Sequence, residues 1–146
     1  MLITNHVVAG AVIGAVAPGP TSAFALGIAS HVVMDSLPHW GHDDYGVFIK
    51  VAVVDGLVGL TTLATLARAA SPDQRASVVA GMLGACLPDT DKPSTLFFGR
   101  SPFPAWVDEA QKRIQNEAQE RMPYEAVGGL VGAVLVRSWL RRRLPR

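Results

Sequence analysis

The sequence predicts an all-α fold, a compact bundle of five or six helices that forms one domain over residues 1–146 and associates with a membrane. Three observations predict it. Long stretches of the chain are apolar and uncharged, prolines and capping residues mark their ends, and no stretch alternates apolar with polar residues between turn signals. An apolar share of 49% argues against disorder.

The first three expected helices cover residues 4–17, 22–37 and 47–70. Thr4 or Asn5 is a suitable N-cap for the first helix, and a Pro-Gly-Pro run ends it. The second helix ends before Pro38, because the residue before a proline avoids the helical conformation. A polar loop of residues 39–46 then leads to the third helix, which is almost entirely apolar.

The other expected helices cover residues 72–86, 106–121 and 123–142. Ser71 and Pro72 fit the N-cap and first helical position of the first of these. Residues 89–105 are rich in proline, glycine and phenylalanine, so we expect an irregular loop there. The helix over 106–121 is amphipathic, with an apolar stripe of Trp106, Ala110, Ile114 and Ala118. The last helix is apolar and carries a basic tail.

Charge is scarce where the chain is most apolar. Residues 1–34 contain no charged side chain, and residues 51–67 contain only Asp55. Residues 47–67 are long enough to cross a hydrocarbon core about 30 Å thick. The N-terminal stretch has no basic residue ahead of its apolar part, so we interpret it as mature sequence rather than a signal peptide. Five of the last ten residues are arginine, which by the positive-inside rule places the C-terminus in the cytoplasm.

Composition also excludes some classes of function. The formal net charge of +1 gives no field that would attract nucleic acid, so we expect no nucleic-acid partner. The single cysteine, Cys86, excludes an internal disulfide and a cysteine-based zinc finger. The sequence contains neither a phosphate-binding loop nor a nucleophilic serine motif.

The sharpest candidate for chemistry is the segment 31–44, which holds three of the four histidines. His31 and Asp35 are four residues apart on an expected helix and so share a face, from which they can bind one metal ion. Pro38 turns the chain, and His39 and His42 can return over the same end. The segment therefore predicts a divalent metal site, although an ordinary helix pair and two surface histidines would give the same pattern.

Three further elements could complete such a site. His6 lies in the first turn of the first expected helix, where it could also be a capping or solvent-facing residue. Asp89 and Asp91 follow an uncharged helix between two prolines and could hold a cation, or simply form a turn. Asp55 lies in an apolar helix and needs a partner: we favour a metal ion or a metal-bound histidine, and a Ser or Thr hydroxyl is the alternative.

Two strings of residues resemble a known family. His6 with the His31-x-x-x-Asp35-x-x-Pro38-His39 string, and the string Gly84-Ala-Cys-Leu-Pro88-Asp89-Thr-Asp91, resemble small helical proteins of the bacterial inner membrane that are classed as metal-dependent hydrolases. Those proteins are similar in turn to the all-α superfamily of zinc-dependent phospholipase C and S1/P1 nuclease. The resemblance covers residues 1–91.

The resemblance implies ligand roles for His6, His31, Asp35 and His39 and acidic roles for Asp89 and Asp91. The family commonly has a second histidine-rich string after its Pro-Asp-x-Asp loop. This chain has none there, and it has fewer histidines than the phospholipase group has ligands. A full three-zinc cluster is therefore not expected, and one or two ions is the most that the residues support.

The leading hypothesis is a zinc-type hydrolase of the bacterial inner membrane that acts on a phosphoester such as a lipid headgroup. His6, His31, Asp35 and His39 or His42 would bind the metal, which would lower the pKa of a bound water towards about 7. Asp89 or Asp91 would be the general base or bind a second ion, and Asp55 would orient a histidine. The alternatives are a non-catalytic membrane protein with a structural polar or metal cluster, and a partner-binding subunit that docks through residues 106–121.

Overall fold

The computed structural model describes residues 1–142 and confirms the all-α fold. Within these residues there are seven α-helices rather than five or six: α1 (Ile3–Val16), α2 (Pro20–Asp35), α3 (Tyr45–Ala69), α4 (Pro72–Cys86), α5 (Asp91–Phe98), α6 (Ala105–Ile114) and α7 (Met122–Arg142). Two 3-10 turns, η1 (Pro88–Thr90) and η2 (Gln119–Arg121), and two short strands, β1 (Pro38–His39) and β2 (Asn116–Glu117), complete the chain.

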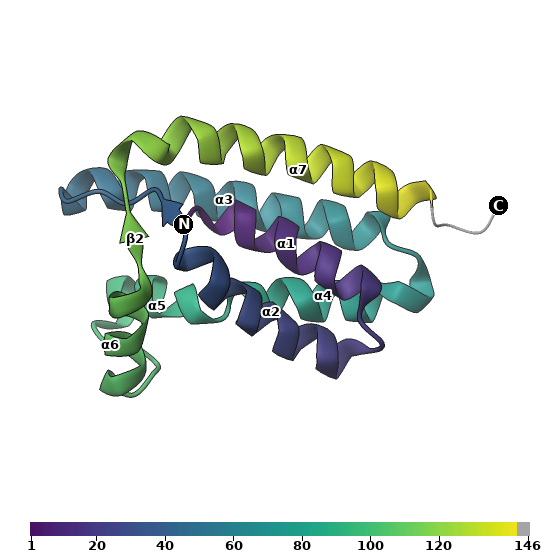
Figure 1. Ribbon diagram of the computed structural model, residues 1–146, viewed down its shortest axis with the longest axis horizontal. Coiled ribbons are helices and arrows are strands. Elements are labelled where there is room, and N and C mark those ends of the chain that lie inside the picture. Colours follow the sequence, from purple (N-terminus) through teal and green to yellow (C-terminus); the bar gives the residue numbers. More distant parts are fainter. Residues whose placement is uncertain (143–146) are drawn as a thin grey trace.

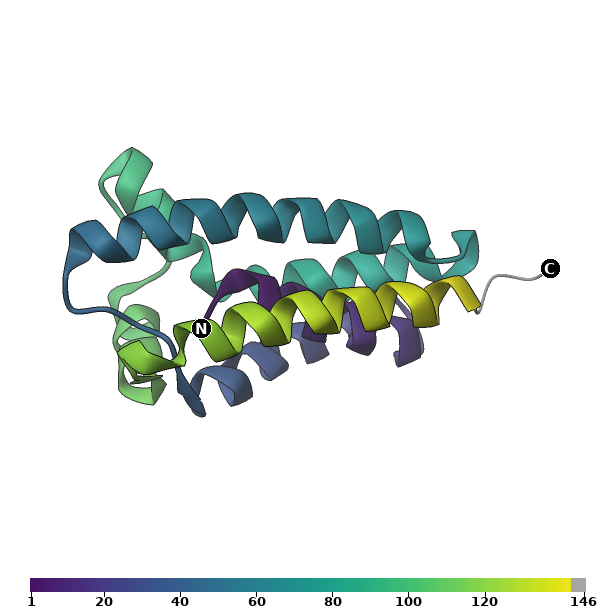
Figure 2. The ribbon, with the colours of Figure 1, turned by 90° about the horizontal axis from the view of Figure 1, so that it is seen from above.

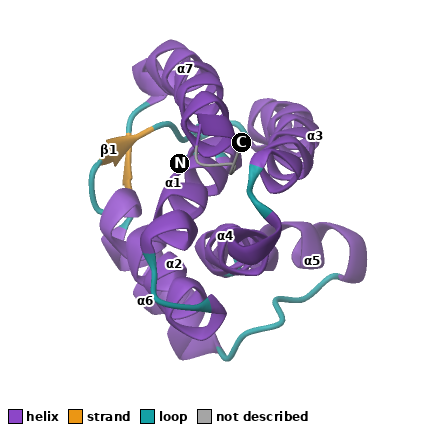
Figure 3. Ribbon diagram, turned by 90° about the vertical axis from the view of Figure 1, so that its right-hand side faces the viewer, coloured by secondary structure: helices purple, strands orange, loops and turns teal. Residues whose placement is uncertain are grey.

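The five long helices lie side by side, and α5 and α6 gather near the end of the bundle where the N-terminus lies (Figure 1). Viewed along the bundle, α1 lies in the middle (Figure 3), and it packs against α2, α3, α4 and α7. Helices α3 and α7 run beside each other, and the first turns of α3 extend beyond the start of α1 (Figure 2). Helix α1, which contains no charged residue, is thus the central helix of the bundle.

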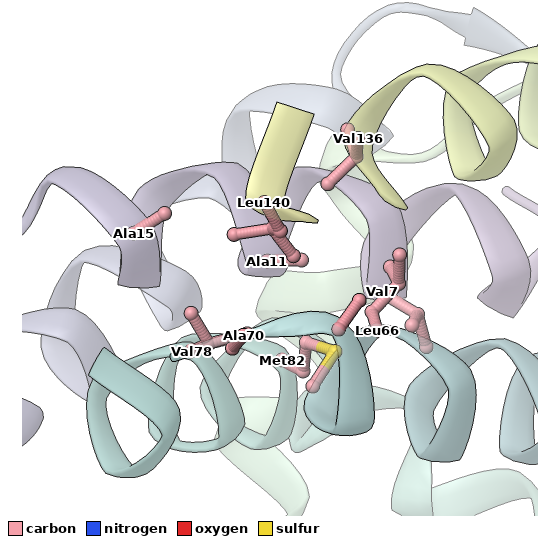
Figure 4. Packing of buried hydrophobic residues seen from close by; sticks show 10 residues of the cluster. Val7, Ala11, Ala15, Leu66, Ala70, Val78, Met82, Val136 and Leu140 are labelled. Carbon is pink, nitrogen blue, oxygen red and sulfur yellow. The ribbon is translucent and has the colours of Figure 1, made fainter. Parts of the chain in front are cut away.

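The core is built from small and medium-sized apolar side chains. Val7 of α1, Leu66 of α3, Met82 of α4 and Leu140 of α7 belong to one apolar cluster, and all are nearly or fully buried (Figure 4). Four alanines and two valines, Val78 and Val136, fill the remaining positions of this cluster. Because the buried side chains are small, the helix axes approach closely, which fixes their relative positions tightly.

Glycines give α1, α2 and α4 their closest contacts. A Cβ atom at Gly10 would overlap the carbonyl oxygen of Gly81, and a Cβ at Gly27 would overlap the same oxygen. A Cβ at Gly84 would overlap the backbone of Phe24. Backbone therefore lies against backbone, as small residues at helix interfaces allow. This contact brings the start of α1 and the ends of α2 and α4 to one end of the bundle.

Two sequence predictions about the second half of the chain were wrong. Residues 89–105 are not irregular throughout, because η1 and α5 occupy 88–98. Gly99 ends α5 with a φ of 72°, the left-handed conformation that glycine adopts most easily. The helix expected over 106–121 ends at Ile114, because the chain becomes extended at Gln115 and pairs with β1.

The expected capping of α1 was also wrong. Leu2, not Thr4 or Asn5, occupies the N-cap position and gives no side-chain cap. Carboxylates from other helices take that role: Asp55 of α3 accepts from the Ile3 amide, and Glu125 of α7 accepts from the Leu2 amide at 2.8 Å. An apolar helix start is thus held by tertiary contacts rather than by its own sequence.

β1 and β2 pair in parallel and place residues 38–39 beside residues 116–117. The sequence predicted no strand, and two residues per strand are too few to show any alternation. Trp106 of the expected apolar stripe is 71% exposed and Ala110 is exposed too, so this stripe is not buried in the bundle. A docking role for α6 stays a prediction.

One helix of the described residues, α3, is long and apolar enough to cross a membrane. Only 17% of its most apolar window is buried inside the protein. Leu57 and Leu60 on this helix are 64% and 67% exposed. The arginines at 143 and 146 of the predicted cytoplasmic tail lie outside the described residues.

Candidate metal centre

Four side chains from three elements meet at the end of the bundle where α1 begins. His6 lies on the first turns of α1, His31 and Asp35 lie on the last turns of α2, and Asp89 lies in η1, directly after α4. A spacing of four residues puts His31 and Asp35 on one face of α2. The side chains of His6, His31 and Asp35 are fully buried, and Asp89 is 11% exposed.

The nitrogen and oxygen atoms of this cluster lie at short distances. His6 Nε2 is 3.2 Å from Asp35 Oδ1 and 3.8 Å from Asp89 Oδ2. His31 Nε2 is 3.2 Å from Asp35 Oδ2 and 4.0 Å from Asp89 Oδ1. The two imidazole rings are stacked, with their centroids 4.1 Å apart. Ligand atoms of His6, His31 and Asp89 all lie within 4.8 Å of one another.

The hydrogen bonds fix which nitrogen of each ring is free. His31 Nδ1 lies 2.8 Å from the carbonyl oxygen of Ala85. A carbonyl only accepts, so Nδ1 carries the hydrogen and Nε2 keeps its lone pair when the ring is neutral. His39 Nδ1 lies 3.0 Å from the Trp40 carbonyl oxygen, which fixes its ring in the same way. Within residues 1–142, four buried ring nitrogens have no hydrogen-bond partner. They are Nδ1 and Nε2 of His6, Nε2 of His31 and Nε2 of His39.

Electrostatics separate the histidines. Burial lowers the pKa of His6 below its ordinary value. Burial acts in the same direction on His31, but its pairing with Asp35 and the charge of Asp89 outweigh burial and raise its pKa. Burial would raise the pKa of Asp35, yet His31 and His6 hold it well below its usual range. Asp35 is therefore an anion beside two imidazoles.

A lysine and a further aspartate contact Asp89 or its neighbour on the side of α5. Lys92 of α5 places Nζ 2.6 Å from Asp89 Oδ1 and 3.5 Å from Asp91 Oδ1. Burial would raise the pKa of Asp89, but the charge of Lys92 outweighs it and lowers that pKa. Burial raises the pKa of Asp91, and the charge of Asp89 adds to this. Asp91 contacts Lys92 rather than the histidines.

The C-terminal half of the chain holds the cluster in place. The Glu125 carboxylate accepts from the backbone amides of Leu2, just before α1, and of Trp40, just after β1. The Ala118 amide donates to the His39 carbonyl oxygen at 2.7 Å. These contacts tie the start of α1 and the segment after α2 to α7 and β2. They therefore set the distance between His6 and His39.

The structure brings together His6, His31, Asp35 and Asp89, and it places His39 at the edge, with Nε2 4.0 Å from Asp35 Oδ1. It does not bring His42 or Asp55 into the cluster. His42 Nδ1 accepts from the Asp44 amide at an exposed turn. Asp55 accepts from the Thr4 hydroxyl at 2.6 Å, which confirms the hydroxyl pairing that was the alternative to a metal role.

Sequence reasoning missed Lys92, Glu125 and the carbonyl of Ala85. Lys92 is next to Asp91 in the chain, so the spacing Asp89-x-Asp91-Lys92 was a usable signal for an internal countercharge. Glu125 is the only charged residue between 122 and 136, and this isolation marks it as a carboxylate that needs a partner. Nothing in the sequence singles out a backbone carbonyl.

The geometry fits a divalent cation. Tetrahedral ligands about 2.1 Å from a zinc ion lie roughly 3.4 Å from one another, and the separations of 3.2–4.0 Å in the cluster are close to this. The unpartnered Nε2 atoms would otherwise be costly in a buried site. Cys86 does not add a thiolate, because burial raises the pKa of its thiol to about 12.

Comparison of the chain with known proteins identifies no relative. No family model, no curated protein and no solved structure matches the chain.

Proposed function

We propose that this protein is a membrane-associated metal-binding hydrolase that acts on a phosphoester, with a lipid headgroup as the expected substrate class. One observation carries the proposal: three histidines with unpartnered Nε2 atoms and two aspartates converge at one end of the bundle. Buried polar atoms without partners are rare in folded proteins, and a shared cation would account for Nε2 of His6 and Nε2 of His31 together.

The residues divide into ligands and a general base. His6, His31 and Asp35 would hold the ion, with Asp89 or His39 as the fourth ligand. A divalent cation supplies Lewis acidity to a phosphoryl oxygen and makes water a nucleophile near neutral pH. Asp89 or Asp91 would take a proton from the attacking water: Asp89 lies beside the histidines, and Asp91, whose pKa is raised, contacts the same Lys92 ammonium as Asp89.

Access to the cluster comes from the side of η1 and α5. Exposure of the side chains rises from 0% at His6 and Asp35 to 11% at Asp89 and 31% at Lys92. A substrate would therefore approach over Asp89. A lipid substrate accords with the exposed apolar side chains of α3, which favour contact with a bilayer.

The test is metal content and turnover of the protein purified in detergent. Wild-type protein should contain about one zinc or manganese ion per chain and hydrolyse a phosphodiester. His31→Ala removes a ligand and should reduce both metal affinity and turnover by roughly tenfold to a hundredfold or more. His42→Ala is the matched control, because His42 lies at an exposed turn, and it should leave both unchanged. Metal-free wild-type protein would refute the proposal.

A structural metal site is the second candidate, and the full burial of His6, His31 and Asp35 favours it. A chelator would then lower the unfolding temperature of wild-type protein, because an ion bound only by the folded state stabilises it. Bound metal without turnover of phosphomonoesters, phosphodiesters or phospholipids would support this candidate over hydrolysis.

A further inference from the structure

The Lys92 ammonium lies where a second metal ion would be expected. In a two-metal site the cations lie only about 3.5–4 Å apart, and a carboxylate between them can bind one cation through each oxygen. Asp89 has this arrangement: Oδ2 faces His6, and Oδ1 faces both His31 and the Nζ of Lys92. The same Nζ lies 3.5 Å from Asp91, the acidic side chain that a second ion would otherwise use.

We infer that the Lys92 ammonium takes the place of a second metal ion beside Asp89 and limits the site to one divalent ion per chain. The inference rests on the proposed metal centre. In this inference the metal ion lies between Asp89 and the histidines, and the Lys92 ammonium lies between Asp89 and α5. Lys92 contacts Asp89 through Oδ1, at 2.6 Å, whereas Oδ2 of the same carboxylate is the oxygen nearer His6.

The balance of side-chain charge agrees with one ion. Asp35, Asp89 and Asp91 contribute three negative charges, and the ammonium groups of Lys92 and of Met1, which lies 3.3 Å from Asp35 Oδ1, neutralise two of them. With neutral histidines, a single divalent ion is enough to offset the remaining charge. A second divalent ion would leave an excess of positive charge in a partly buried site, where charge is costly. The hydrogen bond of 2.6 Å between Lys92 and Asp89 is also short enough to be a strong charge-assisted contact.

The experiment measures how many ions bind. Full-length wild-type protein in detergent is stripped with a chelator and titrated calorimetrically with Zn²⁺ and, separately, with Mn²⁺. Wild type should bind one ion per chain. Lys92→Glu puts a third carboxylate beside those of Asp89 and Asp91 in place of the ammonium, and this variant should bind two ions. Lys112→Glu makes the same charge change on an exposed residue of α6 and should still bind one.

A second variant covers the case in which Lys92→Glu does not fold. Lys92→Met keeps a side chain of similar length and removes the positive charge beside the metal. Because the ammonium repels the metal cation, its removal should lower the dissociation constant of the first ion by about tenfold. Competition with a metallochromic dye measures this constant. Unchanged or weaker binding would contradict the inference.

The outcomes separate the inference from the proposed function. Two ions in wild-type protein would overturn the inference and leave the metal centre intact. One ion in both wild type and a folded Lys92→Glu would also overturn it. No ion in wild-type protein would refute the proposed metal centre itself, and the inference with it.

Discussion

At the scale of single residues, the carboxylates of this protein take three different roles that sequence alone could not separate. Asp35 is an anion between two histidines, Asp89 connects the histidines to Lys92, and Asp55 caps α1. All three lie in or beside apolar stretches. An apolar neighbourhood shows that a carboxylate needs a partner, but the partner comes from a distant segment.

Glu125 gives the prediction that belongs to this scale. Glu125→Ala leaves the amides of Leu2 and Trp40 without their acceptor, and each part-buried unpaired donor is costly. We expect a loss of about 2 kcal/mol in the free energy of unfolding, together with weaker metal binding. Thermal unfolding and metal titration in detergent measure both. Glu120→Ala, an exposed control nearby, should change stability by less than about 0.5 kcal/mol.

At the scale of elements, the start of α4 was predicted to the residue and the end of α6 was not. Ser71 and Pro72 are local signals, because an N-cap and a first-turn proline act within one turn. The end of α6 at Ile114 depends on the pairing of β2 with β1, about 78 residues away in the chain. Local signals therefore located the start of α4, whereas non-local pairing ended α6 early.

The contact between α1 and α4 gives the prediction at this scale. Gly10→Ala would force these helices apart, because the new methyl group overlaps backbone, and we expect a loss of about 1 to 3 kcal/mol in stability. Separation of the helices should also weaken metal binding. Gly56→Ala is the matched control: its Cβ meets nothing within 4 Å, so better helix propensity should stabilise the protein slightly. Equal effects of the two changes would show that the α1–α4 contact is not tight.

At the scale of the whole molecule, the bundle has a small core and a largely apolar exterior. Large hydrophobic side chains of α3 and α7 are exposed, including Leu57, Leu60 and Leu130. A monomer in water rarely exposes so much apolar surface. The low charge content of the sequence indicated this exterior, and the fold shows that the central α1, rather than the longer α3, is the helix buried in the protein.

Membrane partition is the prediction at this scale. Cell fractionation should place wild-type protein in the membrane pellet, where it resists alkaline carbonate and dissolves in detergent. Leu57→Lys puts a charge on the exposed face of α3 and should reduce the pelleted share, because a central lysine disfavours insertion by about 2.5 to 3.5 kcal/mol. Ala110→Lys, which puts the same charge on an exposed position of α6, is the control and should leave the pelleted share unchanged. Wild-type protein that stays monodisperse in the supernatant without detergent would refute membrane association.

The sequence by itself determined the helical fold, most helix starts and the candidates His6, His31, Asp35 and Asp89. Periodicity, prolines and the spacing of His31 and Asp35 are local properties, and they need no knowledge of distant segments. Only the tertiary structure decided that His6 faces His31, that Asp55 and His42 do not join them, and that Lys92 and Glu125 support the cluster. The physical reason is that glycine contacts set the distances between helices, and those distances choose the partners of each buried polar group.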